Sequence, residues 1–170
     1  TLLNGTREGL FNAALALCPE RKNGGRPRIL VPNPFYQVYA VAAAAVGAAA
    51  VLVNATAETG HLPHFAGLPA ETLDSAAICY LCSPANPQGA IAGQDYLEQL
   101  VILAERHDFL IFADECYSEI WRDEPPPGAL AVAESGIHTP EQMRRLAALR
   151  IDAVLVGEAL VTAPDTGEAV

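Results

Sequence analysis

Residues 76–115 read AAICYLCSPANPQGAIAGQDYLEQLVILAERHDFLIFADE, and this stretch decides the fold. It opens with a short apolar run, AAICYLCS, which is typical of a buried strand, and continues through the loop PANPQG. Residues 94–107 repeat apolar side chains at helical spacing, and FLIFADE is a second apolar strand that ends in acidic residues. A strand, a helix and a strand in this order predict two parallel strands of one sheet.

The same alternation continues on both sides of this stretch. On the N-terminal side we expect a helix capped by Asn4 or Thr6, the strand ILVPNP, a helix from about Tyr36 to Gly47, and the strand AAVLVN. On the C-terminal side, ALAVAES and AVLVG are expected strands that flank a helix over 139–149. The predicted fold class is therefore α/β: a three-layer sandwich whose mostly parallel sheet carries helices on both faces.

The composition of the chain argues against several classes of protein function. The chain has 170 residues, of which 51% are hydrophobic, and a formal net charge of -10. So apolar a chain is expected to fold as one domain, 1–170, and its acidic balance argues against a nucleic-acid partner, because phosphates need a basic face. The alanine-rich run 38–53 is too short and too weakly apolar to span a membrane, so no membrane partner is expected. Four cysteines without disulfide-framework spacing indicate reduced thiols, as in a recombinant cytoplasmic protein, and no metal site is predicted.

Four motifs, taken in this order, carry a family resemblance: NGTREGLF from Asn4, PNPFYQVY from Pro32, SPANPQG from Ser83 and FADECYSEIW from Phe112. Together they resemble the large domain of fold-type I pyridoxal-phosphate aminotransferases, and are especially similar to the succinyldiaminopimelate and LL-diaminopimelate aminotransferase branch. The resemblance covers residues 1–128. It implies a flavodoxin-like or Rossmann-like sheet with strand order 2-1-3-4-5-6. The strands counted in this order start at Ile29, Val51, Ile78, Leu110, Leu130 and Val154.

The resemblance implies a vestigial cofactor site at the ends of these strands. The backbone of Gly5, Thr6 and Arg7 would hold the cofactor phosphate, because N–H groups at a helix start favour anions. Tyr36 would stack on the pyridine ring. Each motif also has a plainer interpretation, namely an ordinary helix cap for residues 5–7 and a core position for Tyr36.

Three further residues complete this implied site. Asn86 and Tyr117 would hydrogen-bond the 3-hydroxyl oxygen of the cofactor, and Asp114 would pair with the pyridine nitrogen and keep it protonated. Asn86 before Pro87 could equally be a turn residue. Asp114 is harder to explain as a structural residue, because an unpaired carboxylate at the end of a buried strand is costly.

The sequence departs from the family where the Schiff-base lysine is expected. The strand after the proline loop leads to LAVAESGI instead of a Ser-Leu-Ser-Lys-like segment, and the chain has a single lysine, Lys22, in the loop ERKNGG. We also expect this chain to lack the small domain and the N-terminal segment that close over substrate in the family. Because transamination needs that lysine as a proton shuttle, we expect no catalytic activity and therefore no enzyme.

Residues 129–170 carry a second resemblance. AVAESGIHTPEQMRRLAALRIDAVLVGEAL resembles the C-terminal strand-helix units of indole-3-glycerol-phosphate synthase, a (β/α)8 barrel. This resemblance implies a vestigial phosphate site at Ser135, Gly136, Gly157 and Glu158. A strand end and a helix cap explain Ser135 equally well.

Two unrelated segments in one chain lead to the hypothesis of a designed chimera, with aminotransferase-like residues 1–128 joined near Ala129 to barrel-like residues 129–170. Its expected function is that of a folded scaffold without catalysis, without a required cofactor and without a required partner. The alternative is a residual module that binds pyridoxal phosphate, or another phosphate, weakly. Exposed sheet edges are expected to permit a homodimer.

Overall fold

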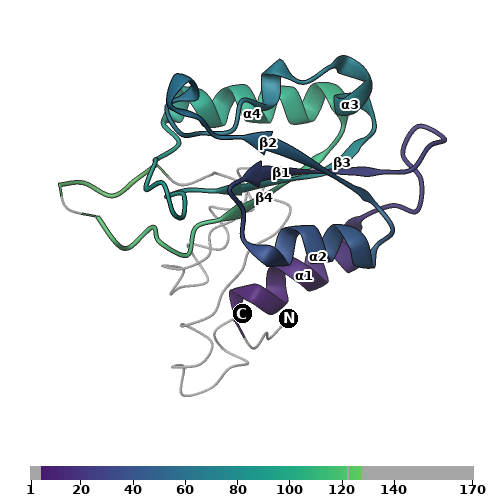
Figure 1. Cartoon of the computed structure of the whole chain (residues 1–170), viewed down its shortest axis with the longest axis horizontal. Coiled ribbons are helices and arrows are strands. Elements are labelled where there is room, and N and C mark those ends of the chain that lie inside the picture. The colour runs from purple at the N-terminus through teal and green to yellow at the C-terminus, as the bar shows by residue number, and fades with distance from the viewer. Residues whose placement is uncertain (1–4, 122, 128–170) are drawn as a thin grey trace, which may run out of the picture.

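A parallel sheet lies at the centre of the protein, in a computed structural model that describes residues 5–121 and 123–127. Its strands are β1 (Arg28–Asn33), β2 (Ala49–Asn54), β3 (Ala76–Cys82) and β4 (Leu110–Asp114). They lie in the order β2-β1-β3-β4, and every pair is parallel (Figure 1). This confirms the predicted fold class and the first part of the predicted strand order. The strands expected to start at Leu130 and Val154 lie outside the described residues, and dimerisation through a sheet edge stays a prediction.

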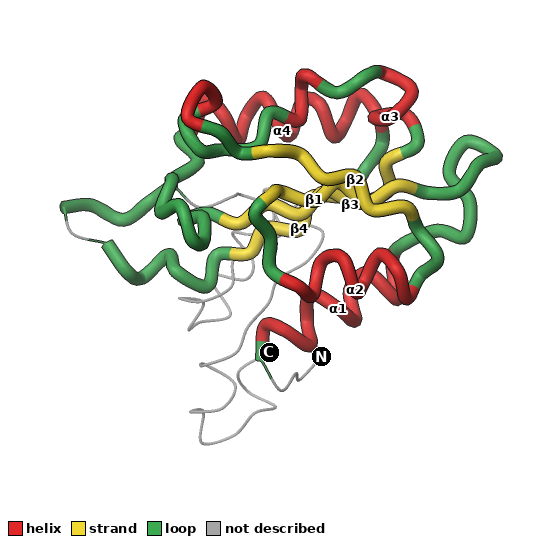
Figure 2. The backbone as a smooth tube through the Cα atoms, in the orientation of Figure 1, coloured by secondary structure: helices red, strands yellow, loops and turns green. Residues whose placement is uncertain are grey.

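Helices cover both faces of this sheet, as Figures 1 and 2 show. On one face lie α1 (Thr6–Leu17) and α2 (Gln37–Ala45), and on the other lie α3 (Ala70–Asp74) and α4 (Gln94–His107). The 3-10 turns η1 (Ala57–Thr59) and η2 (Phe65–Gly67) lie in the connection between β2 and α3. Within the described part of the chain, no helix is long and apolar enough to cross a membrane.

The strands are buried on both sides because successive side chains point to opposite faces. Ile78 and Tyr80 of β3 pack in the core under α1 and α2, whereas Cys79 and Leu81 pack in the core under α4. The register between β3 and β4 places Cys82 opposite Asp114. Both strands therefore end at the same edge of the sheet, where their last side chains lie side by side.

The start of α1 differs from the expectation. Thr6 is the first residue of the helix and not its cap: the N-cap is Gly5, which has no side chain to cap the helix. The other expected cap, Asn4, lies outside the described residues. Gly5 has φ 122° and ψ 170°, a backbone conformation that only glycine adopts without strain. The sequence favoured side-chain capping, but the chain enters the helix through a glycine conformation instead.

Replacing Gly5 with alanine should lower the free energy of unfolding by about 1–3 kcal/mol, because alanine is strained at this φ. Gly93, the N-cap of α4, is the matched control, since its φ is -72° and a Cβ there meets nothing within 4 Å. Urea unfolding of both variants measures the difference. Equal destabilisation by Gly5→Ala and Gly93→Ala would show that φ at residue 5 carries no special cost.

Candidate functional site

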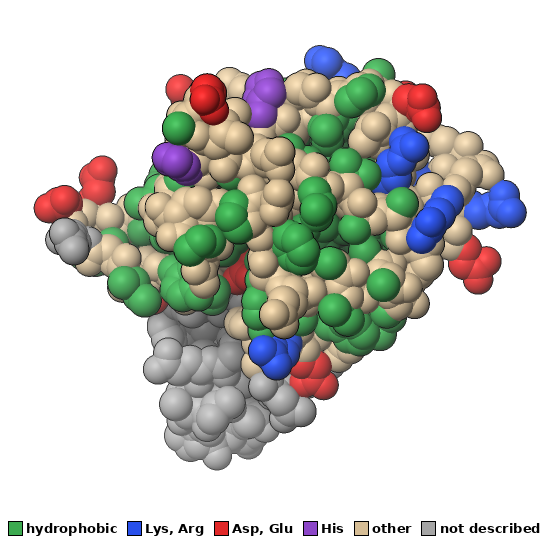
Figure 3. All heavy atoms as spheres, viewed as in Figure 1, with side chains coloured by type: hydrophobic (Ala, Val, Ile, Leu, Met, Phe, Trp, Pro, Cys, Tyr) green, Lys and Arg blue, Asp and Glu red, His purple; other side chains and the backbone are tan. Residues whose placement is uncertain are grey.

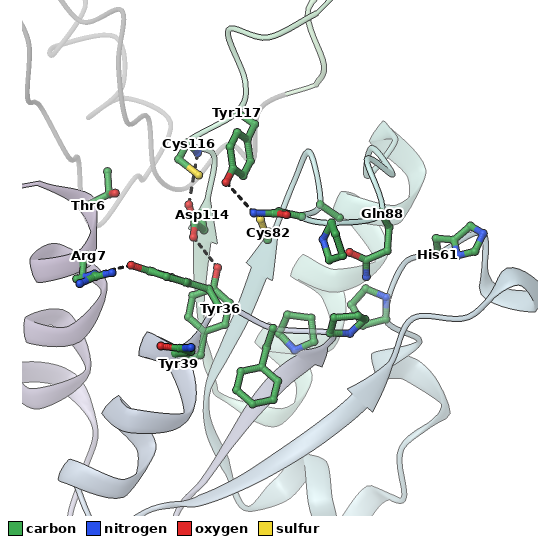
Figure 4. Close-up of a pocket in the computed structure, with 18 residues that line it drawn as sticks. Thr6, Arg7, Tyr36, Tyr39, His61, Cys82, Gln88, Asp114, Cys116 and Tyr117 are labelled. Atoms are coloured by element: carbon green, nitrogen blue, oxygen red, sulfur yellow. Dashed lines mark hydrogen bonds between the residues drawn. The ribbon is translucent and has the colours of Figure 1, made fainter.

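A pocket of about 670 Å³ opens at the carboxyl ends of β1, β3 and β4, beside the N-terminus of α1 (Figure 4). In parallel sheets this edge is where ligands bind, because loops and helix starts converge there. The pocket is lined by Thr6, Arg7, Pro32, Pro34, Phe35, Tyr36, Gln37, Tyr39, His61, Pro63, Cys82, Ala85, Asn86, Pro87, Gln88, Asp114, Cys116 and Tyr117. Six of the seven predicted cofactor residues are among them, and Gly5 directly precedes Thr6 as the cap of α1.

Asp114 is the most buried charged residue of the pocket. It is the last residue of β4 and only 4% exposed. Its Oδ2 accepts a hydrogen bond of 2.5 Å from the Tyr39 hydroxyl, and its Oδ1 accepts a long one of 3.4 Å from the Cys116 backbone N–H. Both donors are neutral. A carboxylate buried in this way is therefore well suited to pair with a cationic donor that enters the pocket.

Tyr39 lies next to this carboxylate and belongs to an aromatic column formed by Tyr36, Tyr39, Tyr80 and Phe112. Its ring stacks on Tyr80 at a centroid distance of 4.4 Å, and Tyr80 meets Phe112 edge-on at 5.5 Å. Burial, followed by the nearby Asp114 charge, raises the pKa of the Tyr39 hydroxyl far above its ordinary value. The hydroxyl is therefore a neutral donor at neutral pH.

Asn86 and Tyr117 form a pair on the opposite wall. The Asn86 side-chain amide donates to the Tyr117 hydroxyl oxygen over 2.8 Å, although the two residues come from different loops, after β3 and after β4. Because Tyr117 accepts from Asn86, its own O–H proton remains available as a donor. Figure 4 shows Tyr117 close to Asp114 and Cys116, with its hydroxyl directed into the pocket.

Arg7 and Tyr36 make up the wall beside α1. Arg7 Nε donates to the Tyr36 hydroxyl over 2.5 Å, and the guanidinium carbon lies 5.6 Å from the centroid of the Tyr36 ring. The first hydrogen bond of α1 runs from the Gly9 N–H to the Gly5 carbonyl, so no carbonyl of the helix accepts from the N–H groups of Thr6 and Arg7. The helix dipole and the guanidinium together make this end of the pocket favourable for an anion.

Sequence reasoning gave no role to several lining residues, among them Tyr39, Cys82 and Gln88. The signal for Tyr39 was present, since it lies three residues after Tyr36 in PNPFYQVY and therefore one helical turn further on. Gln88 Oε1 is buried and has no hydrogen-bond partner among the described residues, which suits a pocket that receives a polar ligand. His61 lines the pocket, but among the described residues no group of three His, Cys, Asp or Glu side chains could hold a metal ion.

The chain's single lysine lies at the other end of the sheet. Lys22 belongs to the loop between α1 and β1, and its Nζ is hydrogen-bonded to Asp108, just before β4 begins. Figure 3 shows the basic side chains of this region gathered on one side of the molecule, away from the segment that follows β4 in Figure 1. Because β1 spans six residues, Lys22 is separated from the pocket by roughly 20 Å of strand. The expected position of Lys22 outside the site is thus confirmed.

The second predicted site cannot be compared with the structure in the same way. Its residues lie outside the described part of the chain, so this phosphate site stays a prediction: Ser135, Gly136, Gly157 and Glu158.

A family model described as aminotransferase class I and II matches residues 1–150. The chain belongs to this aminotransferase family. It is 39% identical over 106 residues to an LL-diaminopimelate aminotransferase of Desulforudis audaxviator, a match that covers 62% of this chain and 27% of that protein. It is 32% identical over 132 residues to the LL-diaminopimelate aminotransferase of Dehalococcoides mccartyi, covering 78% of this chain and 33% of that protein. The chain spans about a third of the length of these curated relatives.

Solved aminotransferase structures share the described fold. An aminotransferase of Neisseria meningitidis superposes with a TM-score of 0.69 and 33% identity, covering 74% of this chain and 32% of that one. An aminotransferase AspB of Helicobacter pylori gives a TM-score of 0.68 and 35% identity, covering 89% of this chain and 36% of that one. The aminotransferase resemblance found in the sequence is therefore confirmed.

These findings overturn the functional hypothesis drawn from the sequence. The expectation of a non-catalytic designed scaffold was wrong, and so was the expectation of no enzyme, because the family and the relatives are aminotransferases. The family match also continues to residue 150, past the junction expected near Ala129. Nor is the expectation of no cofactor supported, since the family implies pyridoxal phosphate. The alternative, a module that binds this cofactor, agrees better with the findings. The hypothesis gave the absence of the Schiff-base lysine from this chain more weight than the four motifs together.

Proposed function

We propose that this chain is the cofactor-binding part of a pyridoxal-phosphate-dependent aminotransferase, and that it binds the cofactor without a covalent bond. The observation that carries the proposal is the buried Asp114 carboxylate in a pocket that also contains an anion-binding helix start and the Asn86–Tyr117 pair. A chain whose single lysine lies at the opposite edge of the sheet has no lysine amine in the pocket.

The described residues fit the cofactor in size and in chemistry. A volume of about 670 Å³ is within the ~300–1,000 Å³ that small-molecule sites occupy. The cofactor has an anionic phosphate, a ring nitrogen that can be protonated and a hydroxyl oxygen. The pocket supplies a complementary group for each: the start of α1 with Arg7, the Asp114 carboxylate, and the Asn86–Tyr117 donors.

Each group of pocket residues is proposed to bind a different part of the cofactor. Pyridoxal phosphate, when bound, supplies an electron sink for reactions at the α-carbon of an amino acid. Asp114 holds a proton at the ring nitrogen, and the N–H groups at the start of α1 hold the phosphate. Tyr117, which accepts from Asn86, donates its own proton to the hydroxyl oxygen of the ring. Tyr36, held in place by Arg7, covers the ring and excludes water from it.

Titration of the purified chain with pyridoxal phosphate, followed by absorbance, tests the proposal. We expect a saturable spectral change that inorganic phosphate competes away, because both ligands use the start of α1. Borohydride reduction followed by peptide mapping should find no label on a pocket residue. Equilibrium dialysis with pyridoxamine phosphate, which has no aldehyde, separates binding in the pocket from reaction at Lys22 or the amino terminus. A change that does not saturate, or label on Lys22 together with no binding of pyridoxamine phosphate, would contradict the proposal.

We further propose an α-amino acid as the substrate class, with LL-diaminopimelate as the first compound to test, because two of the relatives have that name. The test adds the amino acid and a small primary amine to the cofactor-loaded chain, so that the amine replaces the missing lysine as base. Conversion of the amino acid to its oxo acid, detected by mass spectrometry, would support the proposal. Equal conversion in the same mixture without the protein would overturn it.

A further inference from the structure

The Tyr39 hydroxyl contacts one of the two carboxylate oxygens of Asp114, namely Oδ2. The 2.5 Å bond from its hydroxyl to Oδ2 has the length of a hydrogen bond between a hydroxyl group and a charged carboxylate. The carboxylate therefore cannot rotate freely. Within the described part of the chain, the other oxygen, Oδ1, is hydrogen-bonded only to the Cys116 N–H, over 3.4 Å.

The ring of Tyr39 is itself fixed from two sides. It stacks on Tyr80 with an interplanar angle of 14°, and it meets Tyr36 edge-on at 5.9 Å. Tyr80 is anchored in turn, because its hydroxyl donates to the Leu10 carbonyl of α1 over 2.8 Å. Tyr39 is fully buried, so solvent water does not compete with Asp114 for its hydroxyl. Figure 4 shows Tyr39, Asp114 and Tyr36 along one wall of the pocket.

From this arrangement we propose that Tyr39 is a positioning residue of the pocket, whose hydroxyl engages Oδ2 of Asp114 and thereby presents Oδ1 to a cationic ring nitrogen. The inference rests on the proposed function, because it concerns the same cofactor. Tyr39 acts through Asp114 and does not itself contact the ligand nitrogen. Its ring contact with Tyr36 gives the two expected ring-binding residues a common support.

The first test uses the chain without ligand. Tyr39→Phe removes the hydroxyl and keeps the ring, so it should raise the equilibrium constant of unfolding by about 10-fold or more, as expected for a hydrogen bond to a charged group. In an Asp114→Ala background the same change should raise it by less than about 3-fold, because the acceptor is already gone. Equal effects in the two backgrounds would overturn the claim that Tyr39 holds Asp114.

The second test measures whether the hydrogen bond between Tyr39 and Asp114 affects the affinity for a ligand. Tyr39→Phe should weaken binding of pyridoxal phosphate by about 10-fold, but should change by less than about 2-fold the binding of an analogue with carbon in place of the ring nitrogen. A purely structural role would weaken both ligands equally, and that result would overturn the proposal. Tyr80→Phe is the matched control, since it removes a buried tyrosine hydroxyl from the same column without touching Asp114. It should lower stability without discriminating between the two ligands.

The two tests also separate this inference from the proposed function. If the unmutated chain binds neither ligand, the proposed function fails. The unfolding measurements on the single and double variants then decide alone. Coupling between Tyr39 and Asp114 supports the proposal that Tyr39 positions Asp114, and additive effects overturn it.

Discussion

Replacing Asp114 with asparagine should weaken binding of pyridoxal phosphate by about 10- to 100-fold. The carboxylate is 4% exposed and its two hydrogen-bond donors are neutral, so its charge is available to a protonated ring nitrogen. A hydrogen bond to a charged partner contributes about 1.5–3 kcal/mol, which corresponds to this loss of affinity. Asparagine keeps the shape of the side chain and still accepts from Tyr39, so the fold should survive.

The measurement is the dissociation constant from the absorbance titration, made on the unmutated chain and on Asp114→Asn. Glu119→Gln is the matched control, because it removes one negative charge from an exposed position of the same segment and should leave the affinity within about 2-fold. An unchanged affinity in Asp114→Asn would show that the carboxylate does not pair with the ring, and the proposed function would lose the observation on which it rests.

Truncation of Tyr80 to alanine should lower the free energy of unfolding by about 3–5 kcal/mol, the range for removal of a large buried aromatic side chain. Tyr80 is fully buried at the centre of β3 and connects Tyr39, Phe112 and the Leu10 carbonyl. The variant loses both ring contacts and leaves the carbonyl of Leu10 without this donor. The change therefore also weakens the attachment of α1 to the sheet.

Denaturant unfolding of Tyr80→Ala measures this loss, with the slope against denaturant as a check that the transition stays cooperative. Val41→Ala is the control, because Val41 is 55% exposed on α2 and its truncation should cost less than about 1 kcal/mol. A loss at Tyr80 no larger than at Val41 would mean that the column of rings does not hold the two layers together.

Much of the fold followed from periodicity. The helix expected over residues 94–107 has those bounds in α4, since Gly93 and Asp108 flank a clear amphipathic run. The order of the four described strands followed from the family resemblance and was confirmed. The cap expected at Thr6 was wrong, because the helix begins at that residue and the N-cap position is Gly5, which has no capping side chain.

The positions of those site residues that lie at strand ends could be predicted from the sequence. Asp114 and Asn86 follow apolar strands, and the carboxyl ends of parallel strands share an edge, so their convergence could be expected. Tyr39 could not be found in the same way. Its partner Asp114 is 75 residues away, and the bond depends on how α2 packs on the sheet. The functional hypothesis failed for another reason: the lysine was judged as though the site needed it within this chain.

The sequence by itself determined the alternation of strands and helices, the two-sided burial of β3, and the chemical groups at the strand ends, because these depend on local spacing and on residue type. The tertiary structure alone decided which groups meet: Tyr39 with Asp114, Asn86 with Tyr117, and Arg7 with Tyr36. Each pair joins segments that are 29 to 75 residues apart. Contacts of this kind form only when the folded sheet brings distant helices and loops together, and no local pattern specifies that geometry.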